Sequence, residues 1–339
     1  MERRSADDGT LDYARDDRNK SPLLEAFRSS NAALKHALME FLDEEKVRPL
    51  LRVDELIAAM RQTLAEFSEG KWKQPLRGVL AQEGGFFGVM PASGSSMGIK
   101  MVTYYPQNAG TRLPTHMAVI ALFDPKTGEP LALMDGRYIT EMRTAAVSAV
   151  ATDALASPDA KVLALLGAGV QGRAHLETLA RVRRFQEIRI WNRSPERAER
   201  FAKEHGVKSM TLEAAVRDAD VVVTATSAHE PILKGEWLKP GAHVNAVGAS
   251  RPNWRELDDA AMANVVIVDS YEGARNEAGD VILAGITPYA ELGEVLNGTK
   301  RVDSGATTIF KSLGMAVEDV AAAKLVYDAS LGDGLPSGR

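Results

Sequence analysis

Cysteine is absent from the 339 residues of the chain, and its absence excludes several kinds of chemistry. Without cysteine there are no disulfides, no thiolate metal ligands and no cysteine nucleophile. The chain also lacks the HxH and HExxH patterns and any clustered carboxylate motif, so we expect no protein-held metal. A GxSxG motif is missing as well, which argues against an α/β-hydrolase.

The chain also has no strong excess of positive or negative charge and no long apolar run. The formal net charge is only −5, which leaves no electrostatic footprint for nucleic acid or for an anionic membrane. No apolar run approaches the roughly 20 residues that a transmembrane helix requires. The first 20 residues mix both charge signs and lack the apolar core of a secretory signal. We therefore expect a cytoplasmic protein with neither a nucleic-acid nor a membrane partner.

What is present begins with Lys161–Ser194, which has the pattern of a strand, a glycine turn, a helix and a second strand. Val162–Leu166 is a short apolar run, typical of a parallel strand that is buried on both faces. Glycines directly after such a strand permit a tight bend and let the backbone come close to a pyrophosphate. The pyrophosphate then lies at the N-terminus of the next helix. The pattern predicts a dinucleotide site. Its GxGxxG motif consists of Gly167, Ala168, Gly169, Val170, Gln171 and Gly172.

The second strand of this unit, Ile188–Trp191, ends just before the residues that select the cofactor. An acidic residue there would bind the ribose 2′-hydroxyl of NAD, whereas an arginine with small polar neighbours suits the 2′-phosphate of NADP. The chain has Asn192, Arg193 and Ser194 at this position and no acid. We therefore predict NADPH as the cofactor.

The alternation of strands and helices in this half of the chain predicts an α/β fold with a Rossmann-type, doubly wound parallel sheet. Further buried strands are expected within Ala219–Thr226, Gly241–Ser250 and Asn264–Asp269, with their carboxyl ends beside the cofactor. Thr308–Met315 is expected to begin a helix that packs back on the first part of the chain.

A different pattern precedes this region. Residues 51–67 have apolar residues at helical spacing, and residues 74–133 form short β-like segments broken by glycine, proline and asparagine. This predicts an amphipathic helix and an antiparallel sheet. We divide the chain into a polar N-terminal extension (1–38), a substrate and dimerisation domain (39–143, completed by a C-terminal helix, 312–330) and a dinucleotide-binding Rossmann domain (144–311).

Three basic residues stand out before the glycine turn. Arg77 and Lys100 lie inside strand-like runs, and Arg143 opens an alanine-rich helix among small neighbours. Taken singly, each is best interpreted as a solvated surface charge, and a shared cationic pocket stays open as the alternative. Among the histidines, we place only His116, which follows Thr115 at the start of a strand, near a ligand.

Several separated motifs match one family. GIKMVTYYPQN, MDGRYITEMRTAAVSAVAT, LLGAGVQGRAH, PGAHVNAVGASRPNWRELD, AGDVILAG, ELGEVL and FKSLGMAVED resemble the ornithine cyclodeaminase/mu-crystallin family, from about residue 39 to residue 327. The segments EIRIWNR, EPILKGEW and GASRPNWRELDD are most similar to its mu-crystallin branch of NADPH-dependent ketimine reductases. The resemblance implies a homodimer in which the β-rich domains form a shared barrel and the Rossmann domains stand outside.

The resemblance also implies a set of site residues. Arg77, Lys100 and Arg143 are expected to converge on a substrate carboxylate, and Ser250 and Glu277 to lie in the ligand pocket. The positions that match cofactor contacts in the family are Thr115, His116, Gly167, Ala168, Gly169, Val170, Gln171, Asn192, Arg193, Ser194, Arg197, Thr226, Val247 and Ser312.

One difference from the family pattern helps to distinguish two of the activities found in the family. The cyclodeaminases have an aspartate, in a segment of the form GGDxPGKxEL, where this chain has Ser250. That aspartate is the expected acid and base of ornithine deamination, and a serine needs an activating partner to replace it as a base. The resemblance therefore implies hydride transfer from NADPH to the C=N carbon of a cyclic imino acid, of the piperideine-2-carboxylate or pyrroline-2-carboxylate type, which gives a cyclic amino acid.

Three alternatives stay open: an ornithine cyclodeaminase, an alanine dehydrogenase of the same fold, and a non-catalytic, crystallin-like protein that binds a small ligand. Retention of Arg77, Lys100 and Arg143 disfavours the last of these. Lys100 is the residue expected to handle the proton of the imine nitrogen, because a lysine pKa falls beside another cation or in a dry site. A purely electrostatic contact with the substrate carboxylate is an equal alternative for Lys100.

Overall fold

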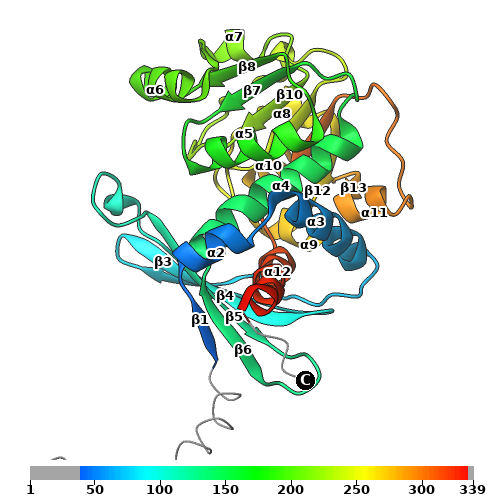
Figure 1. Cartoon of the computed structure of the whole chain (residues 1–339). Helices are drawn as coiled ribbons and strands as arrows, with labels where there is room; N and C mark the ends of the chain where they lie inside the picture. The colour runs from blue at the N-terminus through cyan, green and yellow to red at the C-terminus, as the bar shows by residue number, and fades with distance from the viewer. Residues whose placement is uncertain (1–38, 335–339) are drawn as a thin grey trace, which may run out of the picture. The chain divides into compact units, whose positions relative to one another are not determined.

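The computed structural model describes residues 39–334. From Glu40 onward the chain forms one compact unit, which contains two β-sheets (Figure 1). The predicted polar extension, residues 1–38, lies outside the described residues. The predicted α/β fold class is confirmed, whereas the division into a substrate domain and a Rossmann domain at residue 143 stays a prediction.

The first sheet is built from the region where an antiparallel sheet was predicted. Its six strands have the order β1-β6-β5-β4-β3-β2, and the neighbours from β6 to β2 pair antiparallel. The edge strand β1 pairs parallel with β6, so the sheet is mixed rather than purely antiparallel. A parallel pair needs a long connection, and two helices follow β1 before the hairpins begin. The strands are β1 (Glu40–Leu42), β2 (Gly78–Gln82), β3 (Gly85–Ser93), β4 (Met97–Tyr104), β5 (His116–Phe123) and β6 (Pro130–Asp135).

Four helices pack around this sheet and connect it to the second one: α2 (Glu44–Leu50), α3 (Val53–Ser68), α4 (Arg137–Leu155) and α12 (Ala316–Gly334). The C-terminal helix α12 lies between β3, β4 and β5 on one side and α3 and α4 on the other (Figure 1). A helix surrounded in this way has to be apolar on every face, and Val317, Val320, Ala323 and Val326 are buried.

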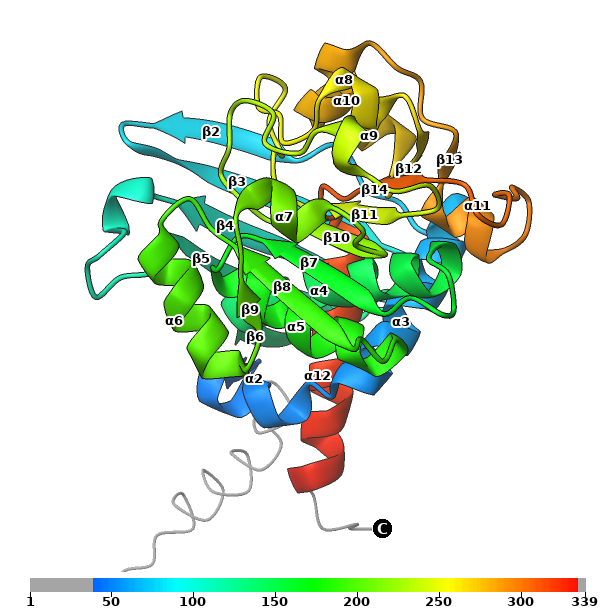
Figure 2. The same cartoon turned by 90° about the horizontal axis from the view of Figure 1, so that it is seen from above.

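The second sheet is the predicted doubly wound parallel sheet. Its eight strands have the order β13-β12-β14-β11-β10-β7-β8-β9, and all neighbours pair parallel (Figure 2). The strands are β7 (Val162–Leu166), β8 (Glu187–Trp191), β9 (Lys208–Ser209), β10 (Val221–Thr224), β11 (His243–Ala246), β12 (Val265–Val268), β13 (Ala290–Glu291) and β14 (Thr308–Lys311). Between them lie α5 (Val170–Val182), α6 (Pro195–His205), α7 (Leu212–Val216), α8 (Asp259–Met262), α9 (Tyr271–Glu277), α10 (Gly279–Ala284) and α11 (Leu292–Leu296).

Strand β14 corrects one prediction. Residues Thr308–Lys311 were expected to begin a helix, but they form a buried strand between β11 and β12, and the helix starts only at Ala316. The segment is short, has a β-branched residue at each of its first two positions, and lies between Gly305 and Gly314, which are both at positive φ; these features favour a strand over a helix. A smaller correction concerns Arg143, which lies inside α4 and does not open it.

The glycine turn has the predicted form. Gly167 has a φ of +126°, which strongly favours glycine. A Cβ atom on Gly172 would lie 2.1 Å from the Gly167 carbonyl oxygen, so the helix α5 can approach the turn only with glycine at this position. Gly169 is the N-cap residue of α5. Within residues 39–334, no helix combines the length and the apolar character that crossing a membrane would demand.

The central strands of the parallel sheet should dominate the stability of the fold. Leu165 on β7 is completely buried, whereas Leu283 on α10 is 50% exposed. We expect Leu165→Ala to lower the free energy of unfolding by about 2–5 kcal/mol, because a cavity is left in a packed core. The matched control Leu283→Ala should change it by less than about 0.5 kcal/mol. Urea titration monitored by circular dichroism measures both values, and equal losses would contradict this account of the core.

Candidate functional site

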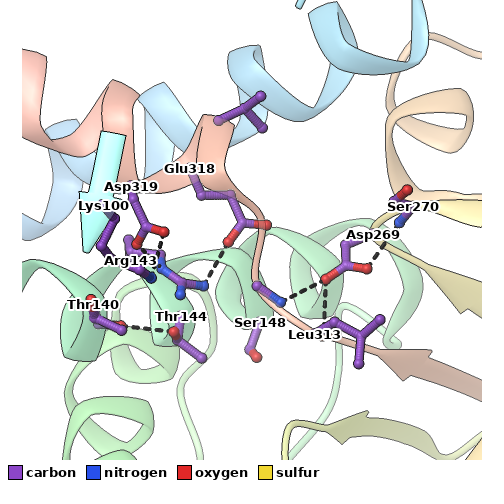
Figure 3. Close-up of polar contacts among 12 residues, drawn as sticks. Lys100, Thr140, Arg143, Thr144, Ser148, Asp269, Ser270, Leu313, Glu318 and Asp319 are labelled. Carbon is purple, nitrogen blue, oxygen red and sulfur yellow. Dashed lines mark hydrogen bonds and ion pairs between the residues drawn. The ribbon is translucent and has the colours of Figure 1, made fainter. Parts of the chain in front are cut away.

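The centre of the candidate site is a buried ion cluster of two cations and two carboxylates (Figure 3). Lys100 lies on β4, Arg143 on α4, and Glu318 and Asp319 in the first turn of α12. The Lys100 Nζ atom is 2.5 Å from Asp319 Oδ2. The Arg143 guanidinium donates from Nε to Asp319 Oδ1 at 2.8 Å and from Nη1 to Glu318 Oε2 at 2.7 Å. Asp319 therefore joins the lysine to the arginine.

Burial dominates the ionisation of this cluster. It lowers the pKa of Lys100 to about 8, while Asp319 opposes the fall and the charges of Arg143 and Arg77 add to it. Burial also disfavours the Asp319 carboxylate, but Arg143 and Lys100 outweigh it and hold its pKa below the usual range. Burial raises the pKa of Glu318 to about 7, although Arg143 acts in the other direction. Lys100 can therefore exchange a proton close to neutral pH.

Arg77 lies at the edge of the cluster. It immediately precedes β2 rather than lying inside a strand, and its side chain is 23% exposed. Its Nε atom donates to Glu277 Oε2 at 2.8 Å, and its Nη2 atom donates to the carbonyl oxygens of Leu313 and Gly314 at 3.1 and 3.2 Å. Burial raises the pKa of Glu277, which Arg77 partly offsets. The two predicted pocket residues Arg77 and Glu277 are thus direct partners.

The turn at Leu313 and Gly314 separates Arg77 from Arg143. Asp269, at the end of β12, accepts hydrogen bonds from the backbone N–H groups of Leu313 at 2.6 Å and Gly314 at 2.9 Å (Figure 3). Gly314 has a φ of +77°, and a Cβ atom there would lie 2.3 Å from Arg143 Nη1. The turn can therefore pass between the two arginines only with glycine at this position.

A pocket opens beside Arg77. Asp269, Glu277 and Gly314 are on its wall, whereas Lys100 and Arg143 are not among the residues that line it. The structure thus brings the three predicted basic residues into one electrostatic environment, with Arg77 at the pocket and the other two in the buried cluster. Ser250 is not brought to this cluster: it is exposed in the loop after β11 and makes no hydrogen bond to another described residue.

His116 lies on the same face of the first sheet as Lys100, because Lys100 is paired with Ile120, four residues along β5, and side chains alternate with a period of two. Thr115 immediately precedes this strand. His116 begins β5 and is paired in register with Tyr104 of β4. Burial is the main cause that lowers its pKa to about 4, and the positive charges of Lys100 and Arg143 contribute to the shift. The imidazole is therefore neutral at physiological pH.

The remaining predicted cofactor positions gather at the carboxyl edge of the parallel sheet. The glycine turn follows β7, and Asn192 follows β8, where its Oδ1 atom accepts a hydrogen bond from the Ala168 N–H at 3.2 Å. Thr226, Val247 and Ser312 follow β10, β11 and β14. In a parallel sheet these strand ends share one edge, which is where open α/β sheets bind ligands.

Several polar groups at this edge are left without a protein partner. The buried atoms Gln171 Oε1 and Ser312 Oγ make no hydrogen bond within the described residues. Arg193 and Arg197 are exposed, and neither forms a salt bridge with another described residue. The N-terminus of α5 adds its backbone N–H groups. The Ser312 hydroxyl, the two guanidinium groups and the backbone N–H groups can donate to a dinucleotide phosphate backbone, whereas Gln171 Oε1 can only accept a hydrogen bond.

Sequence reasoning missed five buried acids, Glu256, Asp269, Asp280, Glu318 and Asp319, each of which is completely shielded from solvent. For the last two a signal exists: adjacent acids at the start of a helix whose next turns are rich in alanine and valine. Acids are common in the first turn of any helix, so the pattern indicates a helix start as readily as a buried ion pair. Across residues 39–334, no three histidine, aspartate or glutamate side chains form a group that could hold a metal ion.

The all-parallel sheet, its glycine turn and the partnerless groups at its carboxyl edge define a Rossmann-type α/β protein. The model of the ornithine cyclodeaminase/mu-crystallin family matches residues 38–334. Ketimine reductase mu-crystallin of Mus musculus is 50% identical over 302 residues, which cover 85% of this chain and 96% of that protein. The chain belongs to the ornithine cyclodeaminase/mu-crystallin family, as the sequence motifs predict.

Two solved structures are similar over nearly the whole described chain. Δ1-pyrroline-2-carboxylate reductase of Thermococcus litoralis, in complex with NADH and L-proline, has a TM-score of 0.83 and 36% identity, and covers 89% of this chain and 100% of that one. An archaeal alanine dehydrogenase dimer with bound NAD has a TM-score of 0.83 and 34% identity, and covers 88% of this chain and 98% of that one.

The ionisation of Glu318 should make the stability of the fold depend on pH. Its pKa is about 7 in the folded chain against 4.5 when unperturbed, so its stabilising contribution is complete below pH 4.5 and is lost as the pH rises through 7. We therefore expect Glu318→Gln, which keeps an oxygen for Arg143, to gain stability relative to the unchanged protein across this range.

Urea unfolding at several pH values measures this difference in the free energy of unfolding. The buried histidines His116, His175 and His243, each with a pKa lowered to about 4, act in the opposite direction but are common to both proteins, so they cancel in the comparison. A difference that stays constant with pH would show that Glu318 does not titrate in this range.

Proposed function

We propose that this chain is an NADPH-dependent ketimine reductase that converts a cyclic 2-imino carboxylate to a cyclic amino acid. The observation that carries the proposal is the buried Lys100–Asp319 pair beside Arg143 and Arg77. Such a cluster combines a proton donor with cationic groups for a carboxylate. The identity of 50% to a ketimine reductase supports the same activity.

Lys100 is the residue that handles the proton in this proposal. When bound, the reduced nicotinamide supplies the hydride for the C=N carbon. Reduction also requires one proton on the nitrogen, and protonation makes the imine carbon more electrophilic. With a pKa of about 8, Lys100 carries a proton at neutral pH and can release it, directly or through a water molecule. Asp319 keeps the ammonium group charged before the reaction.

The carboxylate of the substrate would be bound by Arg77 and by the positive field of Arg143 and Lys100. Arg77 lies at the pocket and is held by only one carboxylate, that of Glu277. A planar guanidinium fixes both the distance and the orientation of a carboxylate, which places the neighbouring imine carbon reproducibly. We propose that Glu277 in turn faces the imine nitrogen side of the ligand.

The cofactor is proposed to be NADPH rather than NADH. Asn192, Arg193 and Ser194 follow β8, and Ser194 caps α6 through the Arg197 N–H at 3.4 Å. This geometry places two exposed guanidinium groups beside a helix N-terminus, which suits a 2′-phosphate dianion. The T. litoralis relative is described with NADH, so the choice depends on these residues of the chain itself.

The other activities of the family are less well supported. Ser250 occupies the position of the cyclodeaminase aspartate, and no hydrogen bond from another described residue activates it as a base. Turnover measured on a panel of cyclic imino acids, pyruvate with ammonia, and ornithine would separate the reductase from an alanine dehydrogenase and a cyclodeaminase. Preferred turnover of ornithine or of pyruvate would refute the proposal.

We also propose a homodimer that forms through the first sheet. Every residue of β2 is exposed in the single chain, including Val79 at 51% and Leu80 at 63%, and Phe41 of β1 is 57% exposed. Exposed apolar strands at both edges of a sheet favour association with a second copy. The alanine dehydrogenase relative is described as a dimer. A cytoplasmic location stays a prediction from the sequence.

Substitution of Arg193 tests the proposed preference for NADPH over NADH. We expect Arg193→Ala to raise the KM for NADPH by about tenfold and to leave the KM for NADH nearly unchanged, because only the 2′-phosphate loses a charged hydrogen bond. Arg200→Ala, on the exposed surface of the helix α6 that follows Arg193, serves as the control. Initial rates with both nucleotides measure the effect, and an equal rise for NADPH and NADH would argue against 2′-phosphate recognition.

Substitution of Lys100 tests its proposed role in protonating the imine nitrogen. We expect Lys100→Met to lower kcat/KM for a cyclic imino acid by about 10²–10⁴-fold, the usual effect of removing a general acid, and to leave the Kd for NADPH unchanged. Lys73→Met, which removes an exposed lysine near the same sheet, should retain full activity. Retention of turnover by Lys100→Met with normal NADPH binding would eliminate both roles considered for Lys100.

A further inference from the structure

Glu256 is a completely buried carboxylate that accepts three hydrogen bonds from the end of β10. Its Oε2 atom accepts from the Thr224 hydroxyl at 2.7 Å. Its Oε1 atom accepts from the Thr226 backbone N–H at 2.7 Å and from the Thr226 hydroxyl at 2.6 Å. Both oxygens are thus used to hold two residues at the point where β10 enters the cofactor edge.

The same carboxylate packs beneath the loop that follows β11. A Cβ atom on Gly248 would lie 2.4 Å from the Glu256 carboxyl carbon and 2.4 Å from the Thr226 carbonyl oxygen. Only glycine permits this approach, because backbone atoms cannot move aside as a flexible side chain can. The ends of β10 and β11 are therefore held in contact through Glu256.

A buried lysine extends the network to a third strand. Lys311, the last residue of β14, donates a hydrogen bond to the Gly248 carbonyl oxygen, and its Nζ atom is 3.0 Å from Asp280 Oδ2. Asp280 Oδ1 accepts from the backbone N–H groups of Glu256 at 2.8 Å and Leu257 at 3.0 Å. The ammonium group of Lys311 thus lies close to both acids, and it partly offsets the rise that burial causes in the pKa of Glu256.

We propose that Glu256 is a positioning residue for the dinucleotide. Three predicted cofactor contacts adjoin this network: Thr226 is bonded to Glu256, Val247 precedes Gly248, and Ser312 follows Lys311. Glu256 itself is buried behind them and acts through them. It fixes the spacing of three strand ends, so the contacts are in place before the cofactor binds, which reduces the ordering cost of binding. This inference rests on the proposed function.

A purely structural role would produce a different result. A carboxylate that serves only the fold would change the stability of the sheet and would leave the affinity for the cofactor unchanged, as expected for a carboxylate that binds the same sheet away from the cofactor edge. Asp220 provides that comparison. It lies immediately before β10, at the opposite edge of the same sheet, and accepts from the Lys161 and Val162 N–H groups at 2.7 Å each.

The experiment compares Glu256→Leu with Asp220→Asn in the full chain. Glu256→Leu leaves Lys311 paired with Asp280, so no uncompensated charge is created. We expect its Kd for NADPH, measured by calorimetry, to rise about tenfold, as for the loss of hydrogen bonds to a charged group. The kcat at saturating NADPH and the KM for the cyclic imino acid should change by less than about threefold. Asp220→Asn should lower the melting temperature and leave the Kd for NADPH unchanged.

A second pair of variants keeps the inference testable if Glu256→Leu does not fold. Thr224→Val removes one hydrogen bond to Glu256 with little change in shape, and Thr224→Ser retains the hydroxyl. We expect Thr224→Val to weaken NADPH binding about threefold and Thr224→Ser to bind normally. An unchanged Kd for NADPH in Thr224→Val and Glu256→Leu would overturn this inference and would leave the proposed function intact. Failure of the unchanged protein to bind NADPH would overturn the proposed function and the inference together.

Discussion

The burial of Lys100 and Arg143 is the constraint on which the rest of the structure depends. A buried cation is tolerated only when carboxylates and hydrogen bonds replace the water it has lost. Here two carboxylates supply that compensation, and both come from α12, whose Asp319 is 176 residues away from Arg143 along the chain. The C-terminal helix is therefore part of the site: without it, β4 and α4 would each carry an uncompensated buried charge.

The parts of this protein that the sequence predicted well are those determined by local chemistry. Gly167 and Gly172 allow a turn that other residues cannot adopt, and the short apolar run Val162–Leu166 requires a strand buried on both faces. The common location of the proposed cofactor positions follows from these elements, because the ends of parallel strands share one edge. Arg77, Lys100 and Arg143 were different: the residue patterns favoured a solvated surface charge for each of them, and only the family resemblance implied a common pocket.

The features that the sequence did not predict depend on contacts between distant segments. Thr308–Lys311 is compatible with a helix start or a strand, and its neighbours β11 and β12 decide the outcome. Similarly, Glu318 and Asp319 have the pattern of any acidic first turn until Arg143 and Lys100 are placed against them. Glu256 gave no signal at all, because its partners Thr224 and Thr226 lie 32 and 30 residues away, at the end of β10 and just beyond it.

One continuous stretch, from β14 to the first turn of α12, connects the two halves of the site. Lys311 contacts the cofactor edge, the carbonyl groups of Leu313 and Gly314 bind Arg77, and Asp319 binds Lys100. Asp269 holds the middle of this stretch through two backbone hydrogen bonds. Because a short, tethered segment cannot shift at one end without moving the other, the edge proposed for the nicotinamide cofactor and the carboxylates that set the charge of Lys100 are held at a fixed separation. Hydride transfer requires such a fixed separation, since the donor and the proton source must reach the same C=N bond.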